Sequence, residues 1–146
     1  MQFEALSVWR AITNLGAYAV EVELKSRIKD QDTSVPIKDG NFSYFAEYAE
    51  GSEYPSYKRI SHDNKIEVIF DAQKRSVGEK FFNIASISHS HDHQHIAYNI
   101  DKNGSENYLL SVENLKEDKV ITENIPNTTG EIVWDTNNQY IYYIGL

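Results

Sequence analysis

Histidines recur at every second position in one short stretch of the chain. Four of the 5 histidines lie in the segment His89-Ser90-His91-Asp92-His93-Gln94-His95. On an extended strand, alternate side chains point to the same side. Four imidazoles on one face could bind Zn, Ni or Cu through their neutral nitrogens. The segment also resembles the H-x-H-x-D-H signature of metallo-hydrolases, although Asp92 falls one position early and only His62 remains to complete a site.

The same histidines can instead form a solvated turn between two strands. We prefer the turn, because the metal site would need four alternating side chains on one face, which a turn cannot provide. It predicts no built metal site and at most weak, adventitious binding of Ni²⁺ or Zn²⁺. A site tighter than micromolar that His91→Ala abolishes would contradict it.

Two Gly-Ser pairs come nearest to a serine nucleophile. They are Gly51-Ser52-Glu53 and Gly104-Ser105-Glu106. Nucleophilic hydrolysis by serine uses a G-x-S-x-G-type turn together with an acid and a histidine, and neither pair has the second Gly. Ser and Gly are common in turns, so both pairs are interpreted as turn residues. We predict no catalytic residue, no cofactor or cofactor-binding residue and no metal ligand in this chain.

Carboxylates cluster at Asp30, Asp32 and Asp39, with Lys29 and Lys38 among them. A Ca²⁺ loop needs ligands at alternate positions, a Gly bend and a closing Glu. That register is missing, so a role in caps and turns is the preferred interpretation.

Composition excludes several classes of function. The net charge of −8 disfavours a nucleic-acid surface, which needs clustered Lys and Arg. With 0 Cys there are no disulfides and no thiolate metal sites. No apolar run approaches the ~20 residues of a membrane span, and the start Met1–Ala5 lacks the pattern of a signal peptide. We therefore expect a soluble, cytoplasmic protein without a membrane partner.

The elements that must position these residues are mainly strands. From Phe3 to Lys29 apolar residues recur every three or four positions, which predicts one N-terminal α-helix. After Pro36 the period changes to two. Turn signals such as Asp39-Gly40 and Thr129-Gly130 separate the runs. The predicted strands cover 42–48, 66–70, 81–87, 95–100, 108–112, 120–125, 132–134 and 140–144.

A faint internal repeat supports this antiparallel β architecture. The segment Asp92–Tyr98 resembles Asn137–Tyr143, at an offset of 45 positions. Blades of a β-propeller repeat at about 40 to 50 residues, with four strands in each blade.

Several blocks of sequence carry a family resemblance. Arg27–Pro36 and Gly51–Arg59 resemble the R-I-K-x-x-D-x-S-V-P and G-x-E-Y-P-x-Y-x-R blocks that begin the propeller domain of the prolyl oligopeptidase family of serine peptidases. The branch most similar is oligopeptidase B (protease II). Ser90-His91-Asp92 resembles an S-P-D turn in which His91 replaces the usual Pro. Further matches are Val68–Asp71, Gly78–Phe82, Ala97–Asp101 and Glu106–Tyr108.

The resemblance implies an N-terminal helical segment over residues 1–34 and a partial β-propeller of about two to three blades over residues 35–146. Members of the family hydrolyse short peptides, after basic residues in the oligopeptidase B branch. Their triad lies in a hydrolase domain that we expect this chain to lack. The chain is then inactive alone, and its expected partner is the remainder of the peptidase.

Two alternatives remain open. One is a small β-rich protein-binding module that docks a partner by strand addition at a sheet edge. The other, ranked last, is a metal-dependent enzyme at the His89–His95 segment. A monomer that melts cooperatively would favour the module, whereas aggregation would favour a propeller fragment with bare apolar faces.

Overall fold

The computed structural model describes residues 32–146, which form two antiparallel sheets. The expectation of a mainly β chain is confirmed. The predicted helix over Phe3–Lys29 lies outside the described residues, and so does Asp30.

The first sheet is built from short strands joined by tight turns. Its order is β1-β3-β4-β5, and β2 also pairs with β3. Gly40 and Asn64 have positive φ angles (54° and 60°), the left-handed backbone that Gly and Asn accept in turns. The strands are β1 (Asp32–Thr33), β2 (Ile37–Asp39), β3 (Phe42–Tyr48), β4 (Ser56–Ser61) and β5 (Ile66–Asp71).

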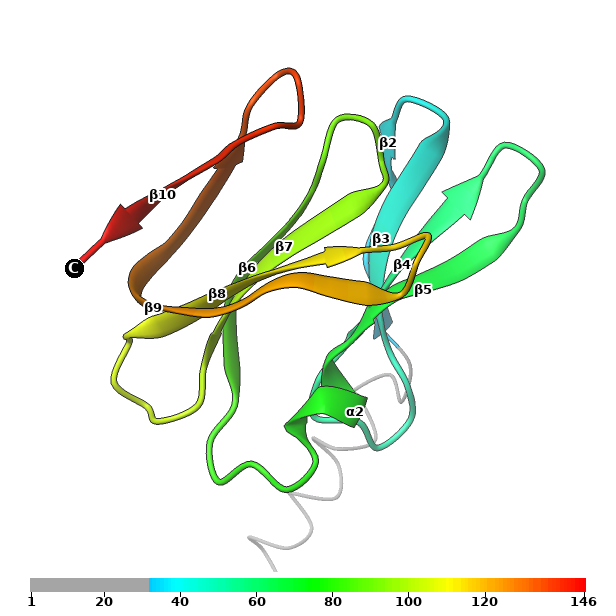
Figure 1. Cartoon of the computed structure of the whole chain (residues 1–146). Helices are drawn as coiled ribbons and strands as arrows, with labels where there is room; N and C mark the ends of the chain where they lie inside the picture. Colours follow the sequence, from blue (N-terminus) through cyan, green and yellow to red (C-terminus); the bar gives the residue numbers. More distant parts are fainter. Residues whose placement is uncertain (1–31) are drawn as a thin grey trace, which may run out of the picture.

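A five-residue helix, α2 (Ala72–Ser76), leads from the first sheet to the second (Figure 1). The Asp71 side chain caps it by accepting the N–H of Lys74 at 2.9 Å. The order of the second sheet is β10-β9-β8-β7-β6. Its strands are β6 (Asn83–His89), β7 (His95–Asp101), β8 (Tyr108–Asn114), β9 (Lys119–Trp134) and β10 (Ile141–Gly145).

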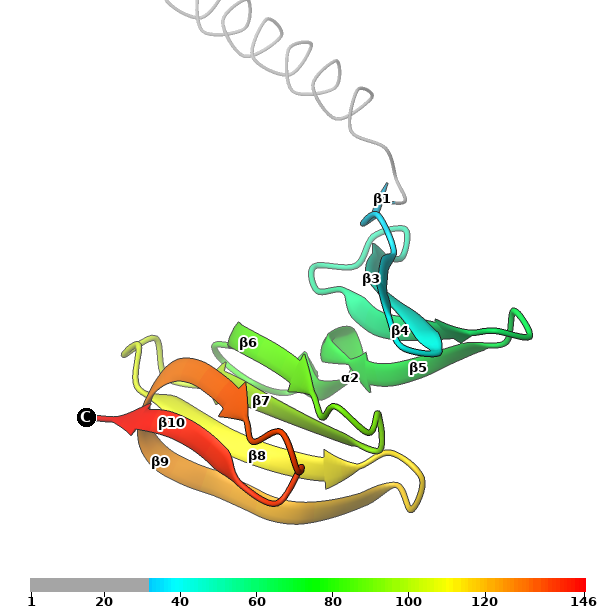
Figure 2. The same cartoon turned by 90° about the horizontal axis from the view of Figure 1, so that it is seen from above.

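The β9 strand corrects one prediction. Residues 120–125 and 132–134 were expected to be separate strands divided by a turn at Thr129-Gly130, but Lys119–Trp134 is one continuous strand. Left-handed residues at Asn124, Asn127 and Gly130 bend it without ending it. Its first part pairs with β8, and its last part pairs with β10. Figure 2 shows this long, curved path.

β7 is buried on both of its faces. Ile96, Tyr98 and Ile100 project toward the first sheet, where they pack with Phe70 of β5. Ala97, on the opposite face, belongs to a second core beneath the β9–β10 pair. That core joins Leu110 and Val112 to Ile125, Ile132, Trp134 and Ile141. Because β9 bends, its end and β10 lie over the rest of the second sheet. The described residues therefore form three successive layers: the first sheet, the body of the second sheet, and the β9–β10 pair.

Arg75 of α2 connects the helix to the second sheet. Its Nη1 and Nη2 donate to the two carboxylate oxygens of Glu113 at 2.8 and 2.7 Å. The Tyr98 hydroxyl donates to the same Glu113 at 2.5 Å. Burial and the neighbouring Glu113 carboxylate raise the pKa of Tyr98 to about 12.

The 45-residue repeat reappears as a repeated turn. The N–H of Ser90 donates to the carbonyl of His95, and the N–H of Asp135 donates to the carbonyl of Tyr140. The left-handed residues are His93 (φ 60°) and Asn138 (φ 59°), again 45 positions apart. β7 and β10 are therefore equivalent strands of successive units, and the end of β9 begins a third unit.

Candidate functional site

The histidine-rich segment spans the end of β6, a turn and the start of β7. Its four histidines do not share a face. The side chain of His95 lies toward Trp134 (ring centroids 6.3 Å apart), and His91 is exposed. His89 and His93 lie against the first sheet, with their ring centroids 5.5 Å apart.

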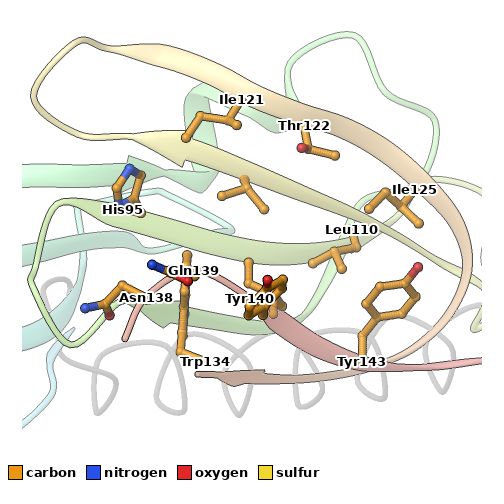
Figure 3. A pocket seen from close by; sticks show the side chains of 12 residues that line it. His95, Leu110, Ile121, Thr122, Ile125, Trp134, Asn138, Gln139, Tyr140 and Tyr143 are labelled. Carbon is orange, nitrogen blue, oxygen red and sulfur yellow. The ribbon is translucent and has the colours of Figure 1, made fainter. Parts of the chain in front are cut away.

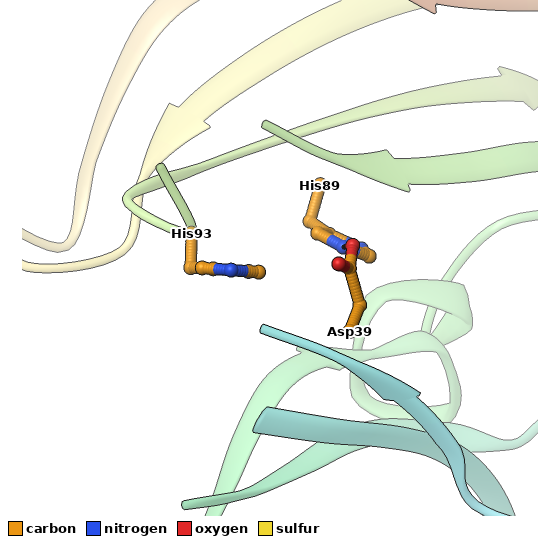
Figure 4. A group of neighbouring side chains, drawn as sticks. All are labelled: Asp39, His89 and His93. Atoms are coloured by element: carbon orange, nitrogen blue, oxygen red, sulfur yellow. Dashed lines mark hydrogen bonds and ion pairs between the residues drawn. The ribbon is translucent and has the colours of Figure 1, made fainter. Parts of the chain in front are cut away.

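Asp39, at the end of β2, completes a three-residue group with these two histidines, which we call the Asp39–His89–His93 cluster (Figure 4). Nε2 of His89 lies 2.9 Å from Oδ2 of Asp39. One ligand atom from each of the three residues lies within 4.8 Å of the others. The cluster therefore joins the two sheets, and its members Asp39 and His89 are 50 positions apart in sequence.

Tyr44 of β3 holds both histidines. Its ring stacks on His89 with centroids 3.8 Å apart and planes inclined by 7°. Its hydroxyl lies 2.8 Å from Nδ1 of His93. Arg59 of β4 holds the turn between β6 and β7 in place, since its Nη1 donates to the carbonyl of His93 at 2.5 Å.

The protonation of the cluster follows from these contacts. The hydrogen bond with His89 lowers the pKa of the Asp39 carboxyl below its ordinary value. Partial burial lowers the pKa of His93, although Asp39 opposes this effect. Burial raises the pKa of Tyr44. At neutral pH the group is thus a carboxylate beside a neutral His93, the forms in which these side chains ligate metals.

The structure places the other candidates apart from this cluster. Ser52 lies in the turn between β3 and β4, and Ser105 lies exposed between β7 and β8. Asp32 lies in β1. Asp39, expected to serve only in a turn, is the residue that sequence reasoning missed as a partner of the histidines, because the pairing depends on how two sheets meet.

Within the second sheet, a groove of about 370 Å³ lies between strands β7, β8 and the first part of β9 on one side and the hairpin of the end of β9 with β10 on the other (Figure 3). Leu110, Ile121 and Ile125 form its floor on one side, and Tyr140 and Tyr143 stand on the other. Ile121 on this floor is 55% exposed, and β10 is the last strand of its sheet among the described residues.

No helix in the described part of the chain is long and apolar enough to cross a membrane.

Successive antiparallel units with a repeated turn, one unit leading through a shared strand into the next, define consecutive blades of a β-propeller. Residues 13–146 match the family model described as prolyl oligopeptidase, N-terminal beta-propeller domain. The chain belongs to this family, so the predicted family membership and propeller architecture are confirmed.

Three relatives illustrate the similarity. Dipeptidyl aminopeptidase BI of Pseudoxanthomonas mexicana is 23% identical over 84% of this chain and 19% of its own length. Protease 2 of Moraxella lacunata is 23% identical over 80% of this chain and 18% of its own length. The structure of oligopeptidase B from Trypanosoma brucei with covalently bound antipain is 25% identical, with a TM-score of 0.77 over 88% of this chain and 19% of that one. The chain thus spans about a fifth of the length of the relatives it matches.

Proposed function

We propose that this chain supplies the first blades of the propeller of an oligopeptidase B-like serine peptidase. In this proposal the chain itself carries no catalytic group. Hydrolysis of short peptides after basic residues is performed by a hydrolase domain supplied from outside residues 32–146. The similarity to oligopeptidase B and to Protease 2 supports this assignment.

The observation that carries the proposal is the exposed outer face of the β9–β10 pair. Side chains alternate along a strand, so Ile132 and Ile141 face the core while Val133 and Tyr142 face outward. Val133 is 62% exposed and its cross-strand partner Tyr142 is 61% exposed. The β9–β10 pair begins the third blade, and a following blade would cover its bare apolar face.

A chimaera tests the proposal. Residues 13–146 of this chain would replace the matched segment of Protease 2 from Moraxella lacunata. We expect the chimaera to cleave a dibasic chromogenic peptide and to be blocked by a serine-directed inhibitor, whereas the 146-residue chain alone shows no turnover. Turnover by the chain alone, or a folded chimaera without activity, would contradict the proposal.

A matched pair of substitutions in the same chimaera tests whether the outer face of the β9–β10 pair contacts a following blade. Val133→Glu places a charge in the proposed contact between blades and should lower activity more than tenfold, because a buried, unpaired carboxylate is strongly unfavourable. Val77→Glu makes the same chemical change at a valine that is 77% exposed beside α2, and should leave activity unchanged. Equal effects would show that the outer face of β9–β10 is not a blade contact.

A further inference from the structure

The Asp39–His89–His93 cluster gathers metal-ligating groups at the place where the two sheets meet. We propose that these three side chains form a binding site for one divalent transition-metal ion of the Zn²⁺ class, which joins the first sheet to the second. This site is independent of the peptidase assignment, because it lies wholly within the described residues.

The ligand set and its dimensions fit such an ion. Two imidazole nitrogens and one carboxylate oxygen are Zn²⁺ ligands, and three protein ligands leave a further position open for water or another small ligand. Bonds of about 2.0–2.1 Å in a tetrahedral site place ligand atoms roughly 3.3 Å apart. Nε2 of His89 and Oδ2 of Asp39 are already 2.9 Å apart, and all three ligand atoms lie within 4.8 Å of one another. In this proposal, small side-chain rotations bring the three ligand atoms to these separations.

The surroundings orient His93 for this role. Its Nδ1 is engaged by the Tyr44 hydroxyl at 2.8 Å, which leaves Nε2 as the free ligand atom. That Nε2 lies directly over Gly40, where a Cβ atom would stand only 2.6 Å from it. A ligating histidine usually donates its second ring N–H to an oxygen, here Nδ1–H to the Tyr44 hydroxyl, because this hydrogen bond fixes both the tautomer and the ring direction.

Access to the cluster is provided by a groove between the two sheets. The groove measures about 520 Å³, and Asp39, Tyr44 and His89 line it. The side chain of Asp39 is 53% exposed and that of His89 is 24% exposed, so an ion can reach both from solvent. An entry path is one of the requirements of a functional metal site.

The remaining histidines of the segment serve as internal controls. His91 is exposed, and its backbone N–H donates to Asn138 at 2.7 Å. His95 lies beside Asn114, 3.2 Å from Nε2 to the amide nitrogen, on the side of Trp134. A histidine tract that collects ions without a built site would depend on all four histidines. The proposed site depends on only two of them and on a distant aspartate.

Isothermal titration of the full chain with ZnCl₂ tests the proposal, with Co²⁺ absorption spectra as a second readout of coordination geometry. We expect one ion per chain, bound with micromolar affinity or tighter. Asp39→Asn and His93→Gln should each weaken binding at least tenfold, a typical order for altered metal sites. His91→Gln and His95→Gln should change the affinity by less than about twofold. Circular dichroism of each variant checks that the sheets are still formed.

Two further measurements make the result decisive. Zn²⁺ should raise the midpoint of thermal unfolding of the wild-type chain and of His91→Gln, but not that of Asp39→Asn, because an ion that binds only the folded chain stabilises it. Tyr44→Phe, which removes only the hydroxyl at Nδ1 of His93, should weaken binding by a smaller factor than His93→Gln. Losses of equal size in the His91 and His93 variants would indicate an adventitious ion only. Absence of Zn²⁺ binding by the folded wild-type chain would also overturn the proposal.

Discussion

Tyr98 is the residue whose ionisation bears most directly on stability. It is 5% exposed, its hydroxyl donates to Glu113, and its pKa is raised to about 12 by burial first and by that carboxylate second. In the unfolded chain the tyrosine hydroxyl ionises near pH 10, so between about pH 10 and 12 the unfolded state loses a proton that the folded state keeps. The stabilisation is complete below pH 10 and is lost as the pH rises toward 12.

We therefore expect the free energy of unfolding to fall by roughly 3 kcal/mol more in the wild type than in Tyr98→Phe across this range, because each pKa unit corresponds to about 1.4 kcal/mol. Urea unfolding at several alkaline pH values measures this difference. The variant cancels the contributions of the other tyrosines, since it keeps all of them. Parallel pH profiles for the two proteins would show that Tyr98 ionises normally in the folded chain.

Sequence reasoning at this scale identified the histidine segment but not its partner. Spacing along one strand could address His89 to His95, since all four lie within seven consecutive positions. Asp39 meets them only because β2 and β6 end on the same side of two adjacent sheets. A contact across 50 positions depends on how two sheets pack, which no local period encodes.

The same limit applies to elements. Period-two runs predicted β3, β5, β7 and β8 well, because apolar residues recur at every second position in each of them. β4 was missed because Lys58 and Arg59 interrupt its apolar pattern, although Arg59 is buried against Phe42 and paired with Glu67. The helix α2 was missed because five residues are too few to show a helical period.

Gly130 allows β9 to continue where a turn was predicted. Its φ of 97° is a conformation that side chains rarely adopt, and a Cβ atom there would stand 2.6 Å from Cβ of Ala85 on β6. Gly51 provides a matched control, with φ of 74° and nothing within 4 Å of the corresponding Cβ position. Both glycines have a positive φ angle, but of the two only Gly130 would bring an added Cβ atom too close to a neighbour.

We expect Gly51→Ala to cost about 1 kcal/mol from backbone strain alone, and Gly130→Ala to cost about 3 kcal/mol because β6 and β9 must also separate. Chemical denaturation of both variants gives the comparison. Adding Ala85→Gly to Gly130→Ala should restore part of the loss. Equal costs for the two glycines would mean that β6 and β9 approach less closely than the structure shows.

At the scale of the whole molecule, the two sheets pack on each other, and the outer face of the β9–β10 pair is uncovered. The core between the two sheets is closed by Phe70, Ile96 and Tyr98, whereas Val133, Tyr142 and Ile144 expose their side chains on the outer face of the third layer. Large exposed apolar patches favour association in water. Within residues 32–146, β10 pairs only with β9, so its other edge adds free backbone groups beside this face.

The purified chain should accordingly self-associate as its concentration rises, through the β9–β10 face. Sedimentation velocity over a concentration series measures this, and Val133→Glu should shift the population toward monomer while Val77→Glu does not. A wild-type chain that stays monomeric throughout the series would favour the self-sufficient binding module over a segment of a larger propeller.

The three layers are joined in two different ways. The first and second sheets are linked through α2, the coil of residues 77–82 and side-chain contacts such as Arg59 with His93. The second sheet and the layer beyond it share the unbroken backbone of β9. The first junction therefore depends on side-chain packing and a short connecting segment, while the second is crossed by one continuous strand. An ion held by Asp39, His89 and His93 would sit at the junction that no strand crosses within residues 32–146, where it would add a direct link between the two sheets.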